Sequence, residues 1–148
     1  MLINEYKDGR IFAGRLDYDS DLLESINKIC IDKGVRAGFV NIIGALSTLK
    51  IGYFKQDSKE YIFLDDVKID SPLEIVSCTG NISIKDAKPF SHLHIIGSDR
   101  DGRCIGGHLM PGTKIFAAEF FIKEITGTDL VRELDPITQL PLWKINQD

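Results

Sequence analysis

The sequence predicts an α+β fold in which one early helix packs on a curved, mainly antiparallel β-sheet. Two observations carry this prediction: a single amphipathic stripe near the N-terminus, and a long succession of β-branched, apolar segments after it. Turn-forming residues separate those segments at short intervals, as is typical of antiparallel strands. Glycines inside the segments favour bends or bulges, which curve a sheet.

The first two expected elements are a strand and the helix. Residues 10–16 are bulky and apolar between turn signals, which predicts a strand. Asp19 or Ser20 then offers an N-cap for the helix. Its apolar stripe follows at helical spacing: Leu22, Leu23, Ile26, Ile29 and Cys30. Gly34 is the expected C-cap.

The rest of the chain predicts strands. Residues 37–54 form one apolar, β-branched run that Gly44 and Gly52 are expected to break. Further strands are expected at residues 61–64, 73–84, 90–96, 104–109 and 114–125. Turn chemistry separates them, as at Asp70-Ser71-Pro72.

Length, charge and cysteine content narrow the class of protein. The chain has 148 residues, which fits a single domain over residues 1–148. Its net charge is −4 and no two basic residues adjoin, so the sequence charge does not support DNA binding, although folding or oligomerisation could assemble a basic patch. No apolar run suits a membrane span and no signal peptide is visible, so we expect a cytoplasmic protein without membrane contact. Three widely spaced cysteines fit a reducing compartment.

The three histidines of the chain fall in one short window. His92 and His94 are two apart on an expected strand, so their side chains point to the same face. Arg100-Asp101-Gly102 suits a three-residue hairpin loop with Gly102 in the left-handed conformation. That loop pairs His94 with His108 and brings the three imidazoles together.

A second register stays open at this point. A two-residue loop, Asp101-Gly102, would place His108 on the other face of the hairpin. A bulge at Gly106-Gly107 would restore His108 to the face of the other histidines, because a bulge shifts the alternation by one residue. The three-residue loop uses Gly102 where a glycine is needed and is preferred.

Three neutral imidazoles suit Zn²⁺ or another borderline divalent ion, and they leave a coordination position open for water, substrate or a carboxylate. Cys104, four residues before His108, is a candidate neighbour of the site. The alternative is that these histidines are satisfied by ordinary hydrogen bonds or lie at the surface. Because all three meet through one hairpin, we predict a metal site formed by His92, His94 and His108.

Two carboxylates are candidate catalytic residues. Glu74 and Glu119 each lie in an apolar segment, where a carboxylate either reaches solvent from the exposed strand face or is held by a partner. A glutamate that faced the histidines could serve as a metal ligand, a hydrogen-bond acceptor or a proton-transfer group.

In this order the segments resemble the plants-and-prokaryotes-conserved (PPC) domain. The resemblance extends from about Arg10 to Trp143 and rests on residues 41–46, 73–82, 92–94, 102–109 and Glu119. It implies an α/β fold with a curved antiparallel sheet and assembly as a homotrimer. Bacterial and archaeal members are commonly described as DNA-binding proteins. The chain lacks the Arg-Gly-Arg core of the plant AT-hook, and residues 71–76 lack the Gly and Arg of the plant partner-contact segment.

The PPC fold is also similar to that of acetolactate decarboxylase, whose zinc is held by an H-x-H pair, a later histidine and glutamate. His92, His94 and His108 match that histidine pattern, which supports a metal at this site but not the decarboxylase reaction. Two functions follow. The first is a homotrimeric, metal-containing regulatory or DNA-associated protein. The alternative is a metal-dependent enzyme acting on a small polar, carbonyl-containing substrate, and the sequence leaves open whether the chain is an enzyme.

Overall fold

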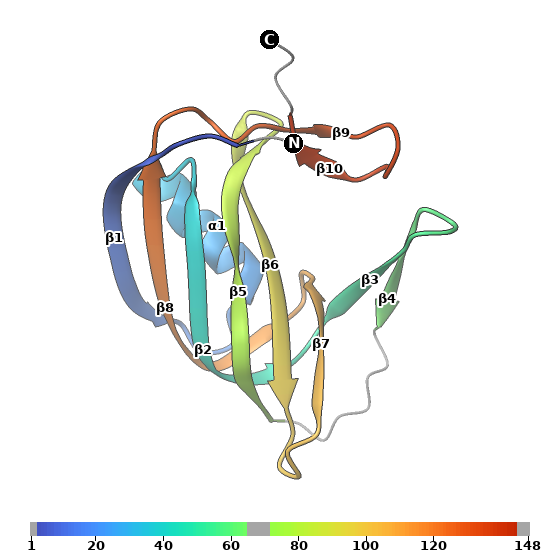
Figure 1. Ribbon diagram of the computed structural model, residues 1–148. Helices are drawn as coiled ribbons and strands as arrows, with labels where there is room; N and C mark the ends of the chain where they lie inside the picture. Colours follow the sequence, from blue (N-terminus) through green and yellow to red (C-terminus); the bar gives the residue numbers. More distant parts are fainter. Residues whose placement is uncertain (1–2, 65–71, 145–148) are drawn as a thin grey trace.

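The computed structural model describes residues 3–64 and 72–144, in which one helix lies against a strongly curved sheet (Figure 1). The elements are β1 (Lys7–Leu16), α1 (Leu22–Lys33), β2 (Gly38–Thr48), β3 (Ile51–Lys55), β4 (Glu60–Leu64), β5 (Leu73–Lys85), β6 (Lys88–Ser98), β7 (Cys104–Leu109), β8 (Lys114–Thr126), β9 (Arg132–Leu134) and β10 (Pro141–Trp143). Eight strands form the main sheet in the order β1-β8-β2-β5-β6-β7-β3-β4, and β9 pairs with β10 separately. The neighbouring strands of the main sheet pair in antiparallel fashion, so the predicted fold class is confirmed.

The hydrophobic core lies between α1 and one face of the sheet. Leu22, Ile26 and Cys30 of the helix are fully buried, as the apolar stripe predicts. They share a cluster with inward-facing strand residues such as Leu93 and Ile95 of β6. Because side chains alternate along a strand, the residues between these two and beside them on β6 turn to the opposite face of the sheet.

The N-cap of the helix lies one or two residues after the predicted candidates. Asp21, not Asp19 or Ser20, is the N-cap, and its carboxylate accepts a hydrogen bond from the Glu24 N–H at 2.9 Å. Asp19 instead takes a left-handed turn conformation at φ 60°. Asp21 also accepts from the Gly112 N–H, a tertiary contact that selects it among adjacent candidates. The predicted C-cap Gly34 is confirmed, with φ 65°.

The run at residues 37–54 breaks between Thr48 and Ile51, not at its glycines. Here the chain leaves β2 and passes to the other end of the strand order, where β3 pairs with β7 and β4. Lys50 marks the crossing, since its carbonyl accepts from the Met110 N–H at 3.1 Å. Gly44 lies inside β2 at a shift of register, and Gly52 lies inside β3 opposite His108.

The other predicted strands are present with ends shifted by at most three residues, the largest shift being at the start of β1. Asp70 and Ser71 of the expected turn lie outside the described residues. The small β9–β10 hairpin was not predicted, because strands of three residues are too short to show a periodic pattern. Within residues 3–64 and 72–144, no helix has both the length and the apolar character that crossing a membrane requires.

Candidate metal centre

The β6–β7 hairpin has the register that the three-residue loop predicts. Asp99 donates its backbone N–H to the Arg103 carbonyl at 3.0 Å, and Gly102 donates to the Asp99 carbonyl at 3.0 Å. Gly102 adopts φ 77°, a left-handed conformation that favours glycine. His94 is therefore the direct partner of His108, without a bulge at Gly106-Gly107. The three-residue loop is confirmed and the alternative register is wrong.

The side chain of Asp99 fixes this loop. Its buried carboxylate accepts hydrogen bonds from the backbone N–H groups of Asp101 and Arg103, both at 2.9 Å. The Arg103 guanidinium adds an ion pair at 2.9 Å. Burial opposes ionisation of Asp99, but the hydrogen bonds from Arg103 and Asp101 outweigh it and lower the pKa of the carboxyl group. An ionised Asp99 thus holds the turn that sets the position of His108.

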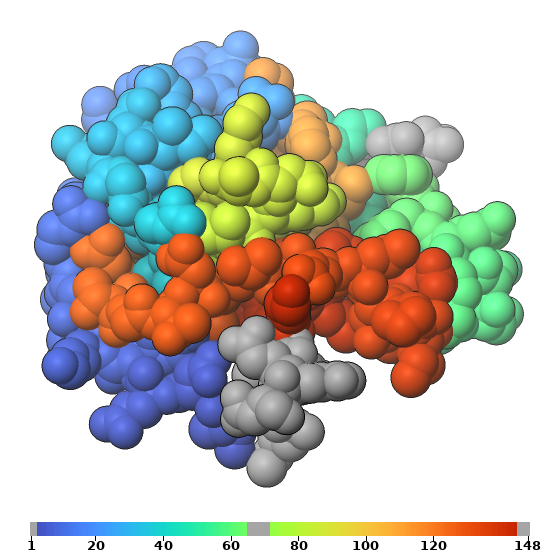
Figure 2. All heavy atoms as spheres, turned by 90° about the horizontal axis from the view of Figure 1, so that it is seen from above, coloured from blue at the N-terminus to red at the C-terminus, as the bar shows by residue number. Residues whose placement is uncertain are grey.

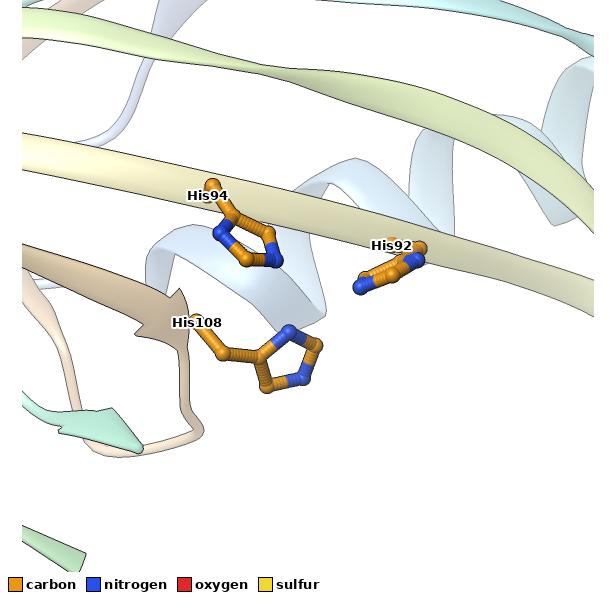
Figure 3. Close-up of side chains that lie close together, drawn as sticks. All are labelled: His92, His94 and His108. Atoms are coloured by element: carbon orange, nitrogen blue, oxygen red, sulfur yellow. The ribbon is translucent and has the colours of Figure 1, made fainter. Parts of the chain in front are cut away.

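The three imidazoles converge on the face of the sheet opposite the helix (Figure 3). Ring centroids lie 5.3 Å apart for His92 and His94, 4.9 Å for His92 and His108, and 5.4 Å for His94 and His108. One nitrogen from each ring lies within 4.8 Å of the others. These nitrogens turn toward the space between the rings (Figure 3), an arrangement that suits one shared ion.

Gly80 of β5 allows β6 to lie close to β5 at His92. A Cβ atom at this position would lie 1.9 Å from the His92 carbonyl oxygen, well inside any real contact. Gly80 pairs with Leu93 in the ladder, directly beside the first histidine. Any larger residue would push β6 away and displace His92.

Two of the three histidines, His92 and His108, are poised to be neutral at pH 7. Burial lowers the pKa of His92 to about 4, and the charges of Arg132, His108 and His94 act in the same direction. Burial likewise lowers the pKa of His108 to about 4, with further contributions from His94 and Arg132. Nδ1 of His108 is buried and has no hydrogen-bond partner among the described residues. A neutral ring with an unpartnered, buried nitrogen fits a metal ligand better than a structural histidine.

The three histidines line a cavity of about 600 Å³, a size typical of small-molecule sites. Its lining comes from strands β3, β4, β5, β6 and β7 and from the β9–β10 hairpin. Figure 2 shows that hairpin, in red, extending across the top of the molecule to the green β3–β4 hairpin. The lining residues are Gly52, Tyr53, Phe54, Tyr61, Lys85, Phe90, His92, His94, Gly107, His108, Met110, Arg132, Leu140, Pro141 and Leu142.

Arg132 of β9 is the buried cation of this cavity, with only 8% of its surface exposed. Its Nε donates to Ser83 Oγ at 2.7 Å, and its Nη2 donates to Asn81 Oδ1 at 2.9 Å. Nη2 also lies 3.3 Å from Nδ1 of His92. The guanidinium carbon lies 5.4 Å from the centre of the Phe90 ring. Burial lowers the pKa of Arg132, although an arginine remains charged at neutral pH.

The other predicted site residues lie away from the cluster. Glu74 is exposed and pairs with Ser98, four residues along β6 from His94, which is roughly 13 Å at ~3.3 Å per residue. Glu119 is exposed on β8, three strand spacings from β6, or about 14 Å. Neither lines the cavity. Cys104 is exposed near the turn and is not in the ligand cluster, so it is not a neighbour of the site within this chain.

Sequence reasoning missed Arg132, Tyr61 and the β10 segment as parts of the site. Arg132 stands alone in a short polar stretch, and no spacing rule connects it to histidines forty residues earlier. Only the sheet order and the fold of the C-terminal hairpin bring these groups together. No signal in the sequence could have identified them.

The chain resembles several solved structures over almost its full length. A metal-containing protein from Archaeoglobus fulgidus is 39% identical, with a TM-score of 0.90 and coverage of 98% of this chain and 100% of that one. A plant- and prokaryote-conserved (PPC) protein from Pyrococcus horikoshii is 32% identical, with a TM-score of 0.89 and 99% coverage of both chains. A candidate DNA-binding protein from Bacteroides thetaiotaomicron is 26% identical, with a TM-score of 0.81 and coverage of 95% and 98%.

Among curated proteins, Bifunctional protein GlmU of Synechococcus sp. (strain JA-3-3Ab) is 28% identical over 131 residues, which is 87% of this chain and 19% of that protein. The chain thus spans about a fifth of the length of the curated relatives it matches. The Plants and Prokaryotes Conserved (PCC) domain family matches residues 3–126. The predicted resemblance is therefore confirmed, while the likeness to acetolactate decarboxylase stays a prediction. With this match and the two archaeal structures, the chain belongs to the Plants and Prokaryotes Conserved domain family, also abbreviated PPC.

Proposed function

We propose that this protein binds one divalent metal ion, expected to be zinc, through His92, His94 and His108, and presents it to a small ligand in the adjoining cavity. The observation that carries the proposal is the convergence of three imidazole nitrogens within 4.8 Å. Two facts support it. The pKa values of His92 and His108 are lowered to about 4, and the Archaeoglobus relative is a metal-containing protein.

Three histidine ligands leave part of the coordination sphere of zinc free. When bound, such an ion polarises a carbonyl group or lowers the pKa of a bound water. None of the described residues that line the cavity is acidic. The described lining therefore offers no carboxylate that could act as a general acid or base. The site therefore favours metal-held ligand binding, as in a regulatory protein. A metal-dependent enzyme acting on a small carbonyl compound is the alternative.

A second part of the proposal is assembly as a homotrimer. The sheet face opposite α1 carries large apolar side chains in the open, including Phe39 at 56% exposure and Phe121 at 59%. Ile11, Ile43 and Val76 are also exposed. Apolar surface of this kind usually marks an interface. Covering it with further copies of the chain fits the trimer expected for the family.

DNA association is a separate candidate, suggested by the Bacteroides relative. The net charge of −4 opposes it, because DNA affinity comes largely from Lys and Arg at phosphates. An electrophoretic shift assay with duplex DNA at low salt tests it. Binding that weakens steeply as salt rises would support DNA association, and no binding at low salt would remove it.

The first experiment on the metal is elemental analysis of untagged protein. Wild type should carry one equivalent of zinc or another transition metal per chain, and His94→Ala should lose it. Cys104→Ser is the matched control, because Cys104 lies on the strand of His108 but outside the ligand cluster. If wild type remains metal-free after incubation with zinc, the histidines return to a structural role.

A further inference from the structure

Arg132 has no acidic partner, unlike the other buried charges among the described residues. Glu124 is paired with Arg10 at 2.6 Å and Asp99 with Arg103 at 2.9 Å. The hydrogen-bond acceptors of Arg132 are all neutral: Ser83, Asn81, the Pro141 carbonyl and His92. A buried cation without a counter-charge is costly to keep. Its position on the wall of a cavity indicates that the missing charge arrives with a ligand.

The guanidinium has donors to spare. Of its five N–H groups, Nε donates to Ser83, Nη1 donates once to Pro141, and Nη2 contacts Asn81 and His92. One N–H on Nη1 is therefore left without a partner in the described part of the chain. The oxygen acceptors lie 2.7–2.9 Å away, whereas His92 Nδ1 is more distant at 3.3 Å, so the contact with His92 is the weakest of the set.

Metal binding would remove this weakest acceptor whichever nitrogen of His92 is the ligand. If Nδ1 binds the ion, its lone pair is no longer available to Arg132. If Nε2 binds the ion, Nδ1 must carry the proton of the neutral ring and becomes a donor. In both cases an N–H on Nη2 of Arg132 loses its acceptor. One free N–H then stands on each terminal nitrogen, which is the number that a carboxylate accepts from a guanidinium.

We propose that the metal-loaded cavity binds a small organic monocarboxylate, with its carboxylate on Arg132 beside the three histidines and its apolar part against the cavity wall. This inference rests on the proposed metal function. A divalent ion adds two positive charges to a cavity whose described lining already holds Arg132 and Lys85 and no acid. The loaded site thus attracts an anion more strongly than the metal-free site does.

The cavity wall favours an apolar tail on that anion. Phe54, Tyr61 and Phe90 line it together with Met110, Leu140 and Leu142. Inorganic phosphate would leave this apolar surface unused, since it has no apolar part to bury. A monocarboxylate with a short branched or aromatic tail satisfies both the cation and the wall.

The test measures binding of 4-methylpentanoate by isothermal titration calorimetry to zinc-loaded and zinc-free protein. The zinc-loaded wild type should bind it, and the uncharged 4-methylpentanamide and inorganic phosphate should each bind at least about tenfold more weakly. Arg132→Met should weaken carboxylate binding by roughly 10- to 100-fold, the range for losing hydrogen bonds to a charged group. Zinc-free wild type should bind more weakly than the loaded form.

Controls separate a ligand site from a structural role of Arg132, which also ties β9 to Pro141. Arg132→Lys retains the cation and should keep part of the affinity, and thermal unfolding checks that both variants fold. Lys144→Met removes a cation that directly follows β10 and, in the described part of the chain, pairs with exposed Glu133, and it should not change binding. Zinc content is measured independently, so a metal-free wild type would refute the metal function rather than the Arg132 assignment.

Two results would overturn the inference. One is full carboxylate affinity in folded, zinc-loaded Arg132→Met. The other is phosphate binding as tight as that of 4-methylpentanoate, which would remove the monocarboxylate as the ligand class. If wild type holds no zinc, carboxylate binding that Arg132→Met abolishes would still support Arg132 as the anion site.

Discussion

Replacing His108 with leucine should separate two effects on the free energy of unfolding: the destabilisation by a buried, unpartnered nitrogen in the metal-free protein, and the stabilisation by bound metal. Nδ1 of His108 is buried without a partner in the described chain, and an unsatisfied buried polar atom costs roughly 1–3 kcal/mol. Because the ring is only half-buried, the lower end of that range applies. His108→Leu should thus raise the free energy of unfolding of the metal-free protein by about 1 kcal/mol, or at least not lower it.

The same substitution should abolish stabilisation by zinc. At a free zinc concentration 100 times the dissociation constant, wild type should gain about 2.7 kcal/mol, because a ligand that binds only the folded state stabilises it by RT ln(1 + [L]/Kd). His108→Leu should gain close to nothing, while Cys104→Ser should respond like wild type. Urea unfolding followed by fluorescence measures this, since Trp143, the only tryptophan, lies in β10 at the cavity hairpin.

Protein concentration must be equal throughout, because the stability of an oligomer depends on it. A loss of about 2 kcal/mol or more in metal-free His108→Leu would refute the reasoning. It would mean that the imidazole makes stabilising contacts in the metal-free fold, so that the cluster is structural. Equal zinc stabilisation of wild type and variant would refute the ligand assignment instead.

Three further predictions concern pH, packing and assembly. The metal-free protein should lose stability as pH falls from about 6.5 to about 4, because the unfolded state takes up protons on His92 and His108 before the folded state does. Urea unfolding across this pH range measures the free energy of unfolding. A free energy of unfolding that does not change with pH, in wild type and in His108→Leu alike, would contradict the prediction. Gly80→Ala should cost about 2–3 kcal/mol and reduce zinc content, because its Cβ would meet the His92 carbonyl oxygen; unchanged stability and zinc content would show that β5 and β6 can separate freely. Phe121→Asp, on the exposed apolar face, should turn a trimer into monomers in size-exclusion chromatography with light scattering; an intact trimer would place the interface elsewhere.

The histidine hairpin was predictable because everything that fixes it is local. His92 and His94 share a face by strand alternation, and Gly102 selects a loop length that sets the partner of His94. The helix was predictable for a similar reason, since its stripe and Gly34 lie within fifteen residues of one another. Only its N-cap was not predicted, because a tertiary hydrogen bond from the Gly112 N–H selects Asp21.

The cavity was not predictable, because its walls come from distant parts of the chain. Arg132 meets His92 across forty residues, through a hairpin of two three-residue strands. Glu74 and Glu119 show the reverse case. Their apolar surroundings suggested a role near the histidines. In the sheet, however, Glu74 lies opposite the end of β6 that is far from His92, and Glu119 lies on β8, three strands from β6. Strand order is a property of the whole sheet, and local sequence carries little information about it.

The alternation of β6 assigns fold and function to separate residues. Leu93 and Ile95 are buried against the helix side, whereas His92 and His94 face the cavity. The core therefore does not depend on the histidines, and a chain without them could keep the same sheet. It follows that a likeness of fold, even at a TM-score of 0.81 with the Bacteroides protein, carries no function by itself. The proposed binding of a metal and a carboxylate would require the three histidines on one hairpin together with Arg132, which contacts His92.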